Sequence, residues 1–363
     1  MEKATMDASG TLQLAELKEL GAVDGPCLTI IAPAQRAPNT ARQDHLRLKA
    51  AAQSAEAALA KHALQEREIE EFLEPVHNLD LESIGGESNK TIVVFRAPQV
   101  FRAFFVHEPL NDLSIVAEHF QILPCLKAVQ EESLYFFVLA LSQKHVRLLR
   151  CTNHSSVEVP FGKDTPNNLE DWLNTRTPTS SPDHGSKRPS ALGSAGNFTS
   201  THDRDKMDSH IENFFHRIDE AVFEALRGEK APLILAGVEH ETTMYRGLNR
   251  YLQLAGRDVH GSPESLKGGE LHRRALEIAR ETFEEPIQKA LELFERLGGS
   301  ERVATKPRDV VQAAATARVS QLFVVDGATQ LGSWDKKTLK VKQGGEGEDL
   351  LNIAALHTIV NGG

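Results

Sequence analysis

Apolar positions in the first 130 residues alternate between short runs and helical stripes. The run CLTIIAP, residues 27–33, is rich in β-branched residues and ends in proline, so it predicts a strand. TIVVFRA and QVFRAFFV predict two more strands, and EHFQILPCLKAV is interpreted as a linker. A helix is expected from about Gln43, because its apolar residues recur at helical spacing. They are Leu48, Ala51, Ala52, Ala55, Ala58 and Leu59.

A second series of elements begins at about Glu131. SLYFFVLALS, KHVRLLRCTN and SSVEVP predict three consecutive strands with tight connections, a meander. A polar segment, 161–200, separates them from a long helix near STHD, where Ser200 or Thr201 is suited to cap the first turn. The apolar stripe of that helix is Met207, Ile211, Phe214, Phe215, Ile218, Val222 and Leu226. APLILAGVE predicts a buried strand, and MYRGLNRYLQLAG a short helix.

A third series starts near His260. The pattern predicts a helix through ELHRRALEIARETFEEPIQKALELFERLGG that is interrupted at Pro286. PRDVVQAAATAR predicts a helix leading into a strand, VSQLFVVDG. KKTLKVKQGGEGEDL is interpreted as a charged connection before a last helix, DLLNIAALHTIV. We therefore expect an α/β protein of three domains in series, at 1–130, 131–259 and 260–363.

Composition narrows the classes of protein. The 363 residues are 40% hydrophobic and 25% charged, which is typical of globular proteins. A formal charge of −10 disfavours a protein that coats nucleic acid, so no DNA partner is expected, although it leaves room for a local basic surface. The three cysteines, Cys27, Cys125 and Cys151, form no CxxC pair and suggest buried thiols in a reducing compartment. Neither a membrane span nor a signal peptide is visible, so we expect a cytoplasmic protein.

Familiar catalytic and metal-binding motifs are missing from the sequence. It has no nucleophile elbow, no phosphate-binding loop and no HExxH motif, since HETTM at His240 lacks the second histidine. The strands LYFFVLALSQ and HVRLLRC supply no carboxylates for a ribonuclease-type magnesium site. We therefore expect no catalytic residue, metal or cofactor.

The polar segment 161–200 is the strongest candidate for a functional site. A structureless run of this length inside a domain is usually functional or disordered, so an insertion without a partner is the alternative. Its tip, GSKRPSALGSAGNF, carries only positive charge and is suited to meet phosphate. The candidate RNA-binding residues are His184, Gly185, Ser186, Lys187, Arg188, Ser190, Arg204 and Lys206.

The order of these elements resembles the archaeo-eukaryotic peptide-chain release factor superfamily, which includes Pelota, and in particular its bacterial branch. The opening PCLTIIAPAQRAPNTARQDHLRLK is similar to that branch. In the middle, PLILAGVEHETTMY and SLKGGELHRRALEIA are similar to the family's strand-and-turn and its entry into the next helix. RDVVQAAATARVSQLFVVDG and DLLNIAALHTIVNGG resemble the last domain. The resemblance implies a middle domain of ribonuclease H-like fold with a long exposed loop, and a last domain like a ribosomal protein.

The resemblance also gives the polar loop a role. In release factors this loop carries a Gly-Gly-Gln tripeptide, which enters the ribosome's peptidyl-transferase centre and helps water to attack the ester of peptidyl-tRNA. Here His184-Gly185 and Ser190-Ala191-Leu192 flank Lys187-Arg188-Pro189 in its place. Proline offers neither a side-chain amide nor a backbone N–H. The implied function is a ribosome- and tRNA-associated factor in termination or rescue of stalled ribosomes that does not hydrolyse the ester.

Two alternatives remain at this stage. One is a peptidyl-tRNA ester hydrolase with a divergent loop, in which Ser190, His184 or Asn197 positions the water. The other is a binding module for protein partners that no longer acts on ribosomes. The charge of −10 and the small number of tyrosines and tryptophans favour this second alternative.

Overall fold

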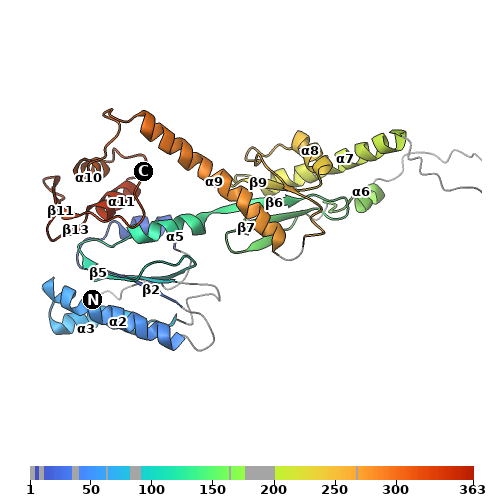
Figure 1. Cartoon of the computed structure of the whole chain (residues 1–363). Coiled ribbons are helices and arrows are strands. Elements are labelled where there is room, and N and C mark those ends of the chain that lie inside the picture. Colours follow the sequence, from blue (N-terminus) through green and yellow to red (C-terminus); the bar gives the residue numbers. More distant parts are fainter. Residues whose placement is uncertain are drawn as a thin grey trace, which may run out of the picture. The chain divides into compact units, whose positions relative to one another are not determined.

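The computed structural model divides the chain into two compact units (Figure 1). The first unit combines Met1–Leu134 with Arg296–Gly363, and the second is Tyr135–Glu295. The expected boundaries at 130 and 259 stay predictions. The residues that the structure describes are 5–7, 12–34, 41–62, 64–81, 91–162, 165–175, 201–266 and 269–363.

A five-stranded sheet organises the first unit, in the order β1-β4-β3-β2-β5. Its strands are β1 (Thr5–Asp7), β2 (Cys27–Pro33), β3 (Thr91–Ala97), β4 (Val100–Val106) and β5 (Leu113–Ala117). The three strands expected from apolar runs are confirmed as β2, β3 and β4, which pair antiparallel in the centre. The two edge strands were not expected, because short edge strands have weaker apolar patterns.

Helices cover both faces of this sheet, because its strands are buried on both sides. On one face lie α2 (Ala41–Lys61) and α3 (Glu66–His77). The expected stripe on α2 is confirmed, with Leu48, Ala52, Ala55 and Leu59 buried. Residues of α1 (Leu14–Leu20), α5 (Leu123–Ser133) and α11 (Leu350–Val360) pack on the other face.

The linker expected at EHFQILPCLKAV is wrong, because most of it belongs to α5. Pro124 suits the first turn of a helix, where no backbone N–H donor is needed. Cys125, Ala128 and Val129 then present one buried face to the sheet. A proline near the start of an apolar segment therefore marks a helix start here and not a break.

The C-terminal part of the first unit corrects two further expectations. The strand expected at VSQLFVVDG is wrong: residues 321–325 form no helix or strand. Val319 and Leu322 both pack on the small core between α10 (Pro307–Ala315) and α11. Residues three apart point to opposite faces of a strand, so this spacing is incompatible with one.

A three-stranded antiparallel sheet lies in the segment interpreted above as a charged connection, in the order β12-β11-β13. Its strands are β11 (Leu331–Asp335), β12 (Lys340–Gln343) and β13 (Glu348–Asp349). Trp334 and Val341 lie opposite each other in the ladder, and both pack on the α10–α11 core. These two contacts explain why a segment rich in lysine and glycine forms a hairpin.

The second unit contains another five-stranded sheet, in the order β10-β9-β6-β7-β8. Its strands are β6 (Tyr135–Ala140), β7 (Arg147–Thr152), β8 (Ser156–Val159), β9 (Leu233–Gly237) and β10 (Val259–His260). β6, β7 and β8 form the expected antiparallel meander. β6, β9 and β10 run parallel to one another, as expected for strands joined by crossover helices.

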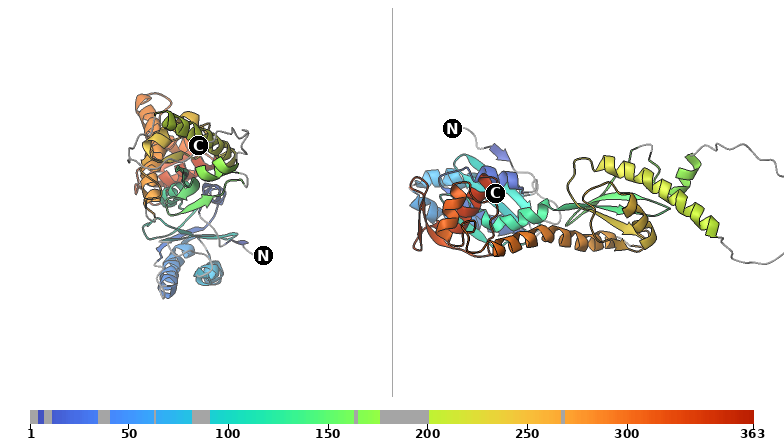
Figure 2. Two further views of the ribbon diagram at one scale, coloured as in Figure 1. Left: turned by 90° about the vertical axis from the view of Figure 1, so that its right-hand side faces the viewer. Right: turned by 90° about the horizontal axis from the view of Figure 1, so that it is seen from above.

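Alternate residues of β6 belong to two separate cores. Phe137 and Leu139 face α7 (Thr201–Ala225), whereas Phe136, Val138 and Ala140 face the first half of α9 (Glu270–Arg296). The right-hand view of Figure 2 shows α7 and α9 flanking the sheet. The stripe expected on α7 is confirmed from Ile211 onward, whereas Met207 is exposed.

Two expectations for the second unit are wrong. The interruption expected at Pro286 is absent, since α9 continues through it. Pro286 is exposed, so the carbonyl that loses its partner can bond to water. The structureless segment expected at 161–200 includes a helix, α6 (Leu169–Thr175). The side chain of Asn168, just before this helix, accepts a hydrogen bond from the backbone N–H of Asp171 at 2.7 Å.

In the part of the chain that the structure describes, no helix is both long enough and apolar enough to cross a membrane.

Asp219 is the polar anchor of the second unit and generates a stability prediction. Its side chain is only 2% exposed on α7 and accepts from Arg250 Nε at 2.6 Å and Tyr245 Oη at 3.3 Å. We expect Asp219→Ala to lower the free energy of unfolding by about 2–4 kcal/mol, because the buried Tyr245 hydroxyl loses its acceptor and Arg250 loses its ion-pair partner. Denaturant unfolding measures this change. The control is Glu220→Ala, which removes an exposed ion pair with Arg217 and should change the free energy of unfolding by about 0.5 kcal/mol or less. Equal losses of stability in both variants would contradict the stabilising role of Asp219.

Candidate functional site

Three parallel strands of the second unit end at the same edge of their sheet. The residues that follow β6, β9 and β10 are 141–144, 238–241 and 261–264, which we call the carboxyl edge. In open α/β sheets this is where ligands usually bind, because connecting loops diverge there and leave a crevice. The carboxyl edge is therefore the candidate ligand-binding site of this unit.

Gly237 fixes how closely the three connections approach. A Cβ atom at this position would lie 3.2 Å from the backbone oxygen of Leu141 and 3.1 Å from Thr242 Cγ2. Its own carbonyl accepts a hydrogen bond from the N–H of Gly261 at 3.0 Å. The glycine thus lies where the ends of β6, β9 and β10 meet, and a larger residue at this position would force its neighbours to shift.

A cavity of about 260 Å³ opens at the carboxyl edge. Two hydrogen bonds between side chains of different connections order its polar lining. The Ser142 hydroxyl donates to Glu264 Oε1 at 2.6 Å, and the Gln143 amide donates to Glu241 Oε1 at 3.1 Å. Each bond therefore fixes a carboxylate against the residues that follow β6.

The electrostatics of this cavity are negative. Glu241 is only 6% exposed, and its burial, together with repulsion from Glu264, raises the pKa of its carboxyl group above the ordinary value. Lys144 Nζ lies 3.8 Å from Glu264 Oε2, but its side chain is almost fully exposed, so solvent screens this charge. Two carboxylates beside one screened ammonium favour hydrogen-bond donors and cations over phosphate.

No group of three or more His, Cys, Asp or Glu side chains that could hold a metal ion occurs among the described residues. The carboxyl edge contributes two carboxylates, Glu241 and Glu264, together with a hydroxyl and an amide. This set provides hydrogen-bonding groups and a buried proton acceptor. It does not form a nucleophile–base–acid triad, because the Ser142 hydroxyl bonds directly to a carboxylate.

The RNA-binding residues predicted from the sequence lie on α7 or outside the described residues. His184, Gly185, Ser186, Lys187, Arg188 and Ser190 lie outside them. Arg204 and Lys206 are in the first two turns of α7, where the Lys206 side chain is exposed.

Both helices that border residues 176–200 contact the carboxyl edge or its neighbourhood. The backbone N–H of Leu169, at the start of α6, donates to the Gln143 carbonyl at 2.8 Å. On α7, Asp208 lies 3.2 Å from Nε2 of His240, in the first turn of α8 (Glu239–Leu248). The helices that precede and follow residues 176–200 are thus both in contact with the carboxyl edge.

Sequence reasoning missed Ser142, Gln143, Glu241 and Glu264. Each lies within five residues of the end of a strand, in LALSQ, LAGVEHE or VHGSPE. Polar residues immediately after such runs are the available signal. The pairing of Ser142 with Glu264 and of Gln143 with Glu241 could not be predicted, because it depends on which strands are neighbours in the sheet.

The comparisons identify the class of protein and then its family. The model of the bacterial archaeo-eukaryotic release factor family 3 matches residues 135–318, just over half of the chain, including the carboxyl edge and the segment 176–200. The chain is thus a release-factor-like protein related to translation factors. It belongs to family 3 of the bacterial archaeo-eukaryotic release factors.

Two solved structures align with the chain. An archaeal translation termination factor, aRF1, is 14% identical over 85% of this chain and 84% of its own, with a TM-score of 0.23. An archaeal protein is likewise 14% identical over 85% of this chain and 83% of its own, with a TM-score of 0.23. No curated protein matches the chain.

Burial of the Glu241 carboxyl group predicts how the stability of the protein depends on pH. A carboxyl group whose pKa is raised by folding stabilises the fold most at low pH, and this contribution is lost as pH rises through the folded-state pKa. We therefore expect Glu241→Gln to raise the melting temperature at pH 7.5, with the gain disappearing toward pH 4. Scanning calorimetry across this range measures it. Glu239→Gln, in the same helix turn but exposed, should show no such gain, and an identical pH profile for the two variants would refute the assignment.

Proposed function

We propose that the protein acts on ribosomes as a release-factor-related translation factor, in termination or in rescue of stalled ribosomes, and that it does not hydrolyse peptidyl-tRNA. The observation that supports this proposal is membership of a release factor family through residues 135–318. We also propose the family's three-domain arrangement with a ribonuclease H-like middle domain, a ribosomal-protein-like last domain, and a cytoplasmic location with tRNA as a contact.

The contact to nucleic acid is assigned to residues 184–190. Lys187 and Arg188 are the only charged residues between Gly185 and Phe198. The cavity at the carboxyl edge has the opposite sign of charge, because of Glu241 and Glu264, so it repels phosphate. The proposed division of roles is that the cationic tip meets tRNA or ribosomal RNA, and that the carboxyl edge supports the base of the segment.

The absence of hydrolysis is argued from three positions. Lys187, Arg188 and Pro189 stand where the family's hydrolytic members have Gly-Gly-Gln. Two glycines permit backbone conformations that lysine and arginine avoid. The glutamine amide has no counterpart, because proline lacks both a polar side chain and a backbone N–H.

We expect the double variant Lys187→Ala/Arg188→Ala to lose co-sedimentation with bacterial ribosomes. Two lost phosphate contacts should also lower the slope of log binding against log salt by about 1 each. A salt series with purified 70S particles measures both quantities. A charge-matched control is Arg273→Ala/Lys289→Ala, which removes two cations from exposed pairs on α9. If both double variants bind like the unchanged protein, the assignment of the tip is wrong.

Release of formyl-methionine from programmed ribosomes distinguishes the proposal from a divergent hydrolase. We expect no release above background at micromolar protein, because no group replaces the glutamine amide. An active release factor is the positive control. If release occurs and Ser190→Ala abolishes it, the protein is an ester hydrolase. If the protein neither binds ribosomes nor releases the ester, the alternative of a protein-binding module is favoured.

A further inference from the structure

The last helix of the first unit is tied to its first sheet by one buried side chain. Asn352 on α11 accepts hydrogen bonds through Oδ1 from the backbone N–H groups of Ile122 at 2.9 Å and Leu123 at 3.1 Å. Its amide donates to the carbonyl of Phe120 at 2.9 Å. Ile122 is the N-cap of α5 and has no capping side chain of its own. Asn352 therefore caps α5 from more than 200 residues away, with a group that does not titrate.

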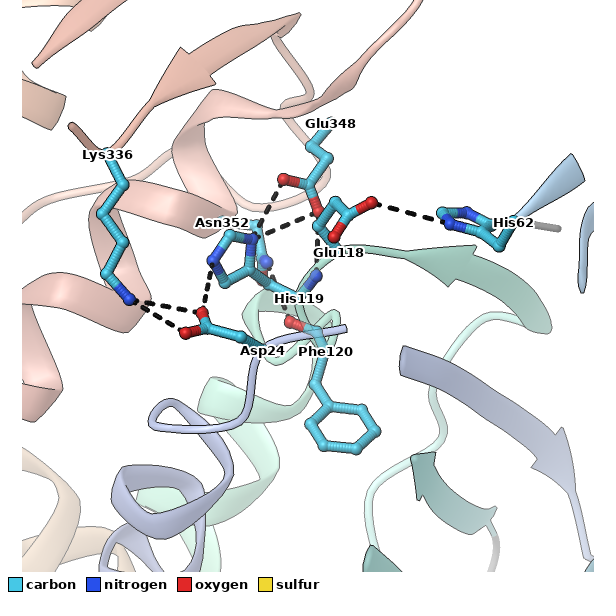
Figure 3. Close-up of polar contacts among 8 residues, drawn as sticks. All are labelled: Asp24, His62, Glu118, His119, Phe120, Lys336, Glu348 and Asn352. Atoms are coloured by element: carbon cyan, nitrogen blue, oxygen red, sulfur yellow. Dashed lines mark hydrogen bonds and ion pairs between the residues drawn. The ribbon is translucent and has the colours of Figure 1, made fainter. Parts of the chain in front are cut away.

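Beside this amide, His119 forms a second connection (Figure 3). Its backbone N–H donates to Glu348 Oε1 at 2.9 Å, and its ring Nδ1 lies 3.0 Å from Glu348 Oε2. Its other ring nitrogen lies 3.7 Å from Asp24 Oδ1. Asp24 is in turn 3.1 Å from Lys336 Nζ, in the turn between β11 and β12. Lys336, Asp24, His119 and Glu348 thus form a continuous series of charged contacts, which we call the His119 clasp.

The histidine can take part in both connections only as a cation. A neutral imidazole has one N–H donor and one acceptor nitrogen, so it can donate to only one of two carboxylates. His119 faces Glu348 on one side and Asp24 on the other, and its side chain is 16% exposed. In the neutral form the hydrogen bond to Glu348 can persist, but the ion pair with Asp24 at 3.7 Å is lost, because the second ring nitrogen then carries a lone pair.

The surrounding charges agree with this geometry. The hydrogen bond to Glu348 raises the pKa of His119, while burial and Lys336 oppose the rise. Burial and repulsion from His119 lower the pKa of His357 on α11. Glu118 turns toward His62 instead, 3.6 Å away, and burial raises the pKa of the Cys27 thiol to about 12. The two histidine pKa values therefore shift in opposite directions, upward for His119 and downward for His357.

We propose that the His119 clasp is a proton-sensitive switch, which holds residues 331–363 on the first sheet when His119 is charged and loosens them when it is neutral. The buried Asn352 amide lies beside the clasp and does not itself titrate, but the hydrogen bonds it makes depend on how firmly α11 is held. Loosening the clasp transmits to α5, because Asn352 caps that helix and α5 leads directly into β6 of the second unit. The switch does not depend on the proposed ribosomal function.

The direction of the pH dependence follows from linkage. A histidine whose pKa is raised by folding contributes stability in full below its unfolded-state pKa, about 6.5. That contribution is lost as pH rises from there through the folded-state pKa. The ratio of open to closed clasp changes by at most about tenfold per pH unit for one proton.

Hydrogen exchange of the full-length protein from pH 6 to 9 tests the proposal. Each rate is divided by the intrinsic rate at the same pH, and the peptides that contain Ile122 and Leu123 report on the clasp. We expect their protection to fall by several-fold across this range, while peptides of β2 and β3 keep theirs. His119→Gln retains a neutral donor to Glu348, and its protection should be low and independent of pH.

Two further measurements keep the test decisive if His119→Gln is poorly folded. Glu348→Gln should shift the transition to lower pH, because His119 loses its main partner. His62→Gln removes the neighbouring histidine, which pairs with Glu118 outside the clasp, and should respond like the unchanged protein. A protection that does not vary with pH, or an NMR titration that places the pKa of His119 at or below 6.5, would overturn the proposal.

Discussion

Burial of β6 on both faces is the constraint on which the second unit depends. Its alternate residues, Phe137 and Leu139 against Phe136 and Val138, need apolar cover on opposite sides of the sheet. That cover is supplied by α7 on one side and α9 on the other, and parallel strands require such crossover helices in any case. Once β6, β9 and β10 are parallel, their carboxyl ends meet at one edge. The cavity and the borders of segment 176–200 are therefore consequences of how one apolar strand is covered.

The first unit depends on a different kind of interaction. Its sheet has apolar cover from α2 and α3 on one face, but the other face is completed by α11, the last helix of the chain. Apolar contacts such as that of Leu356 attract α11 without fixing its register. Asn352 fixes it, because three buried backbone groups must be satisfied and only one rotation of the helix brings the amide to them. The charges of the His119 clasp add a condition that depends on pH to this fixed geometry.

The sequence predicted the elements whose signal is local. β2 and β3 are short runs rich in β-branched residues, and the apolar residues from Ile211 to Leu226 on α7 recur at helical spacing. These elements were therefore predicted correctly. α5 was missed because its segment, EHFQILPCLKAV, was interpreted as a linker. The β11–β12 hairpin was missed because its apolar residues, Trp334 and Val341, are isolated among polar and charged residues. The carboxyl-edge pairs Ser142–Glu264 and Gln143–Glu241 each join residues about 100 positions apart. Nothing in a single sequence encodes such a pair until the order of strands is known.

Charge separates the two halves of the candidate site. Glu241 and Glu264 lie in a partly enclosed cavity, where reduced solvent screening strengthens their potential, whereas Lys187 and Arg188 belong to a polar segment between two helices. The whole chain has a formal charge of −10, so attraction to a polyanion must come from few cations and be short in range. In the proposed function, RNA is therefore met by Lys187 and Arg188 and not by the carboxyl edge, whose carboxylates repel phosphates. Under that proposal, the net negative charge of the protein limits indiscriminate adhesion to nucleic acid, so that binding depends on these two cations.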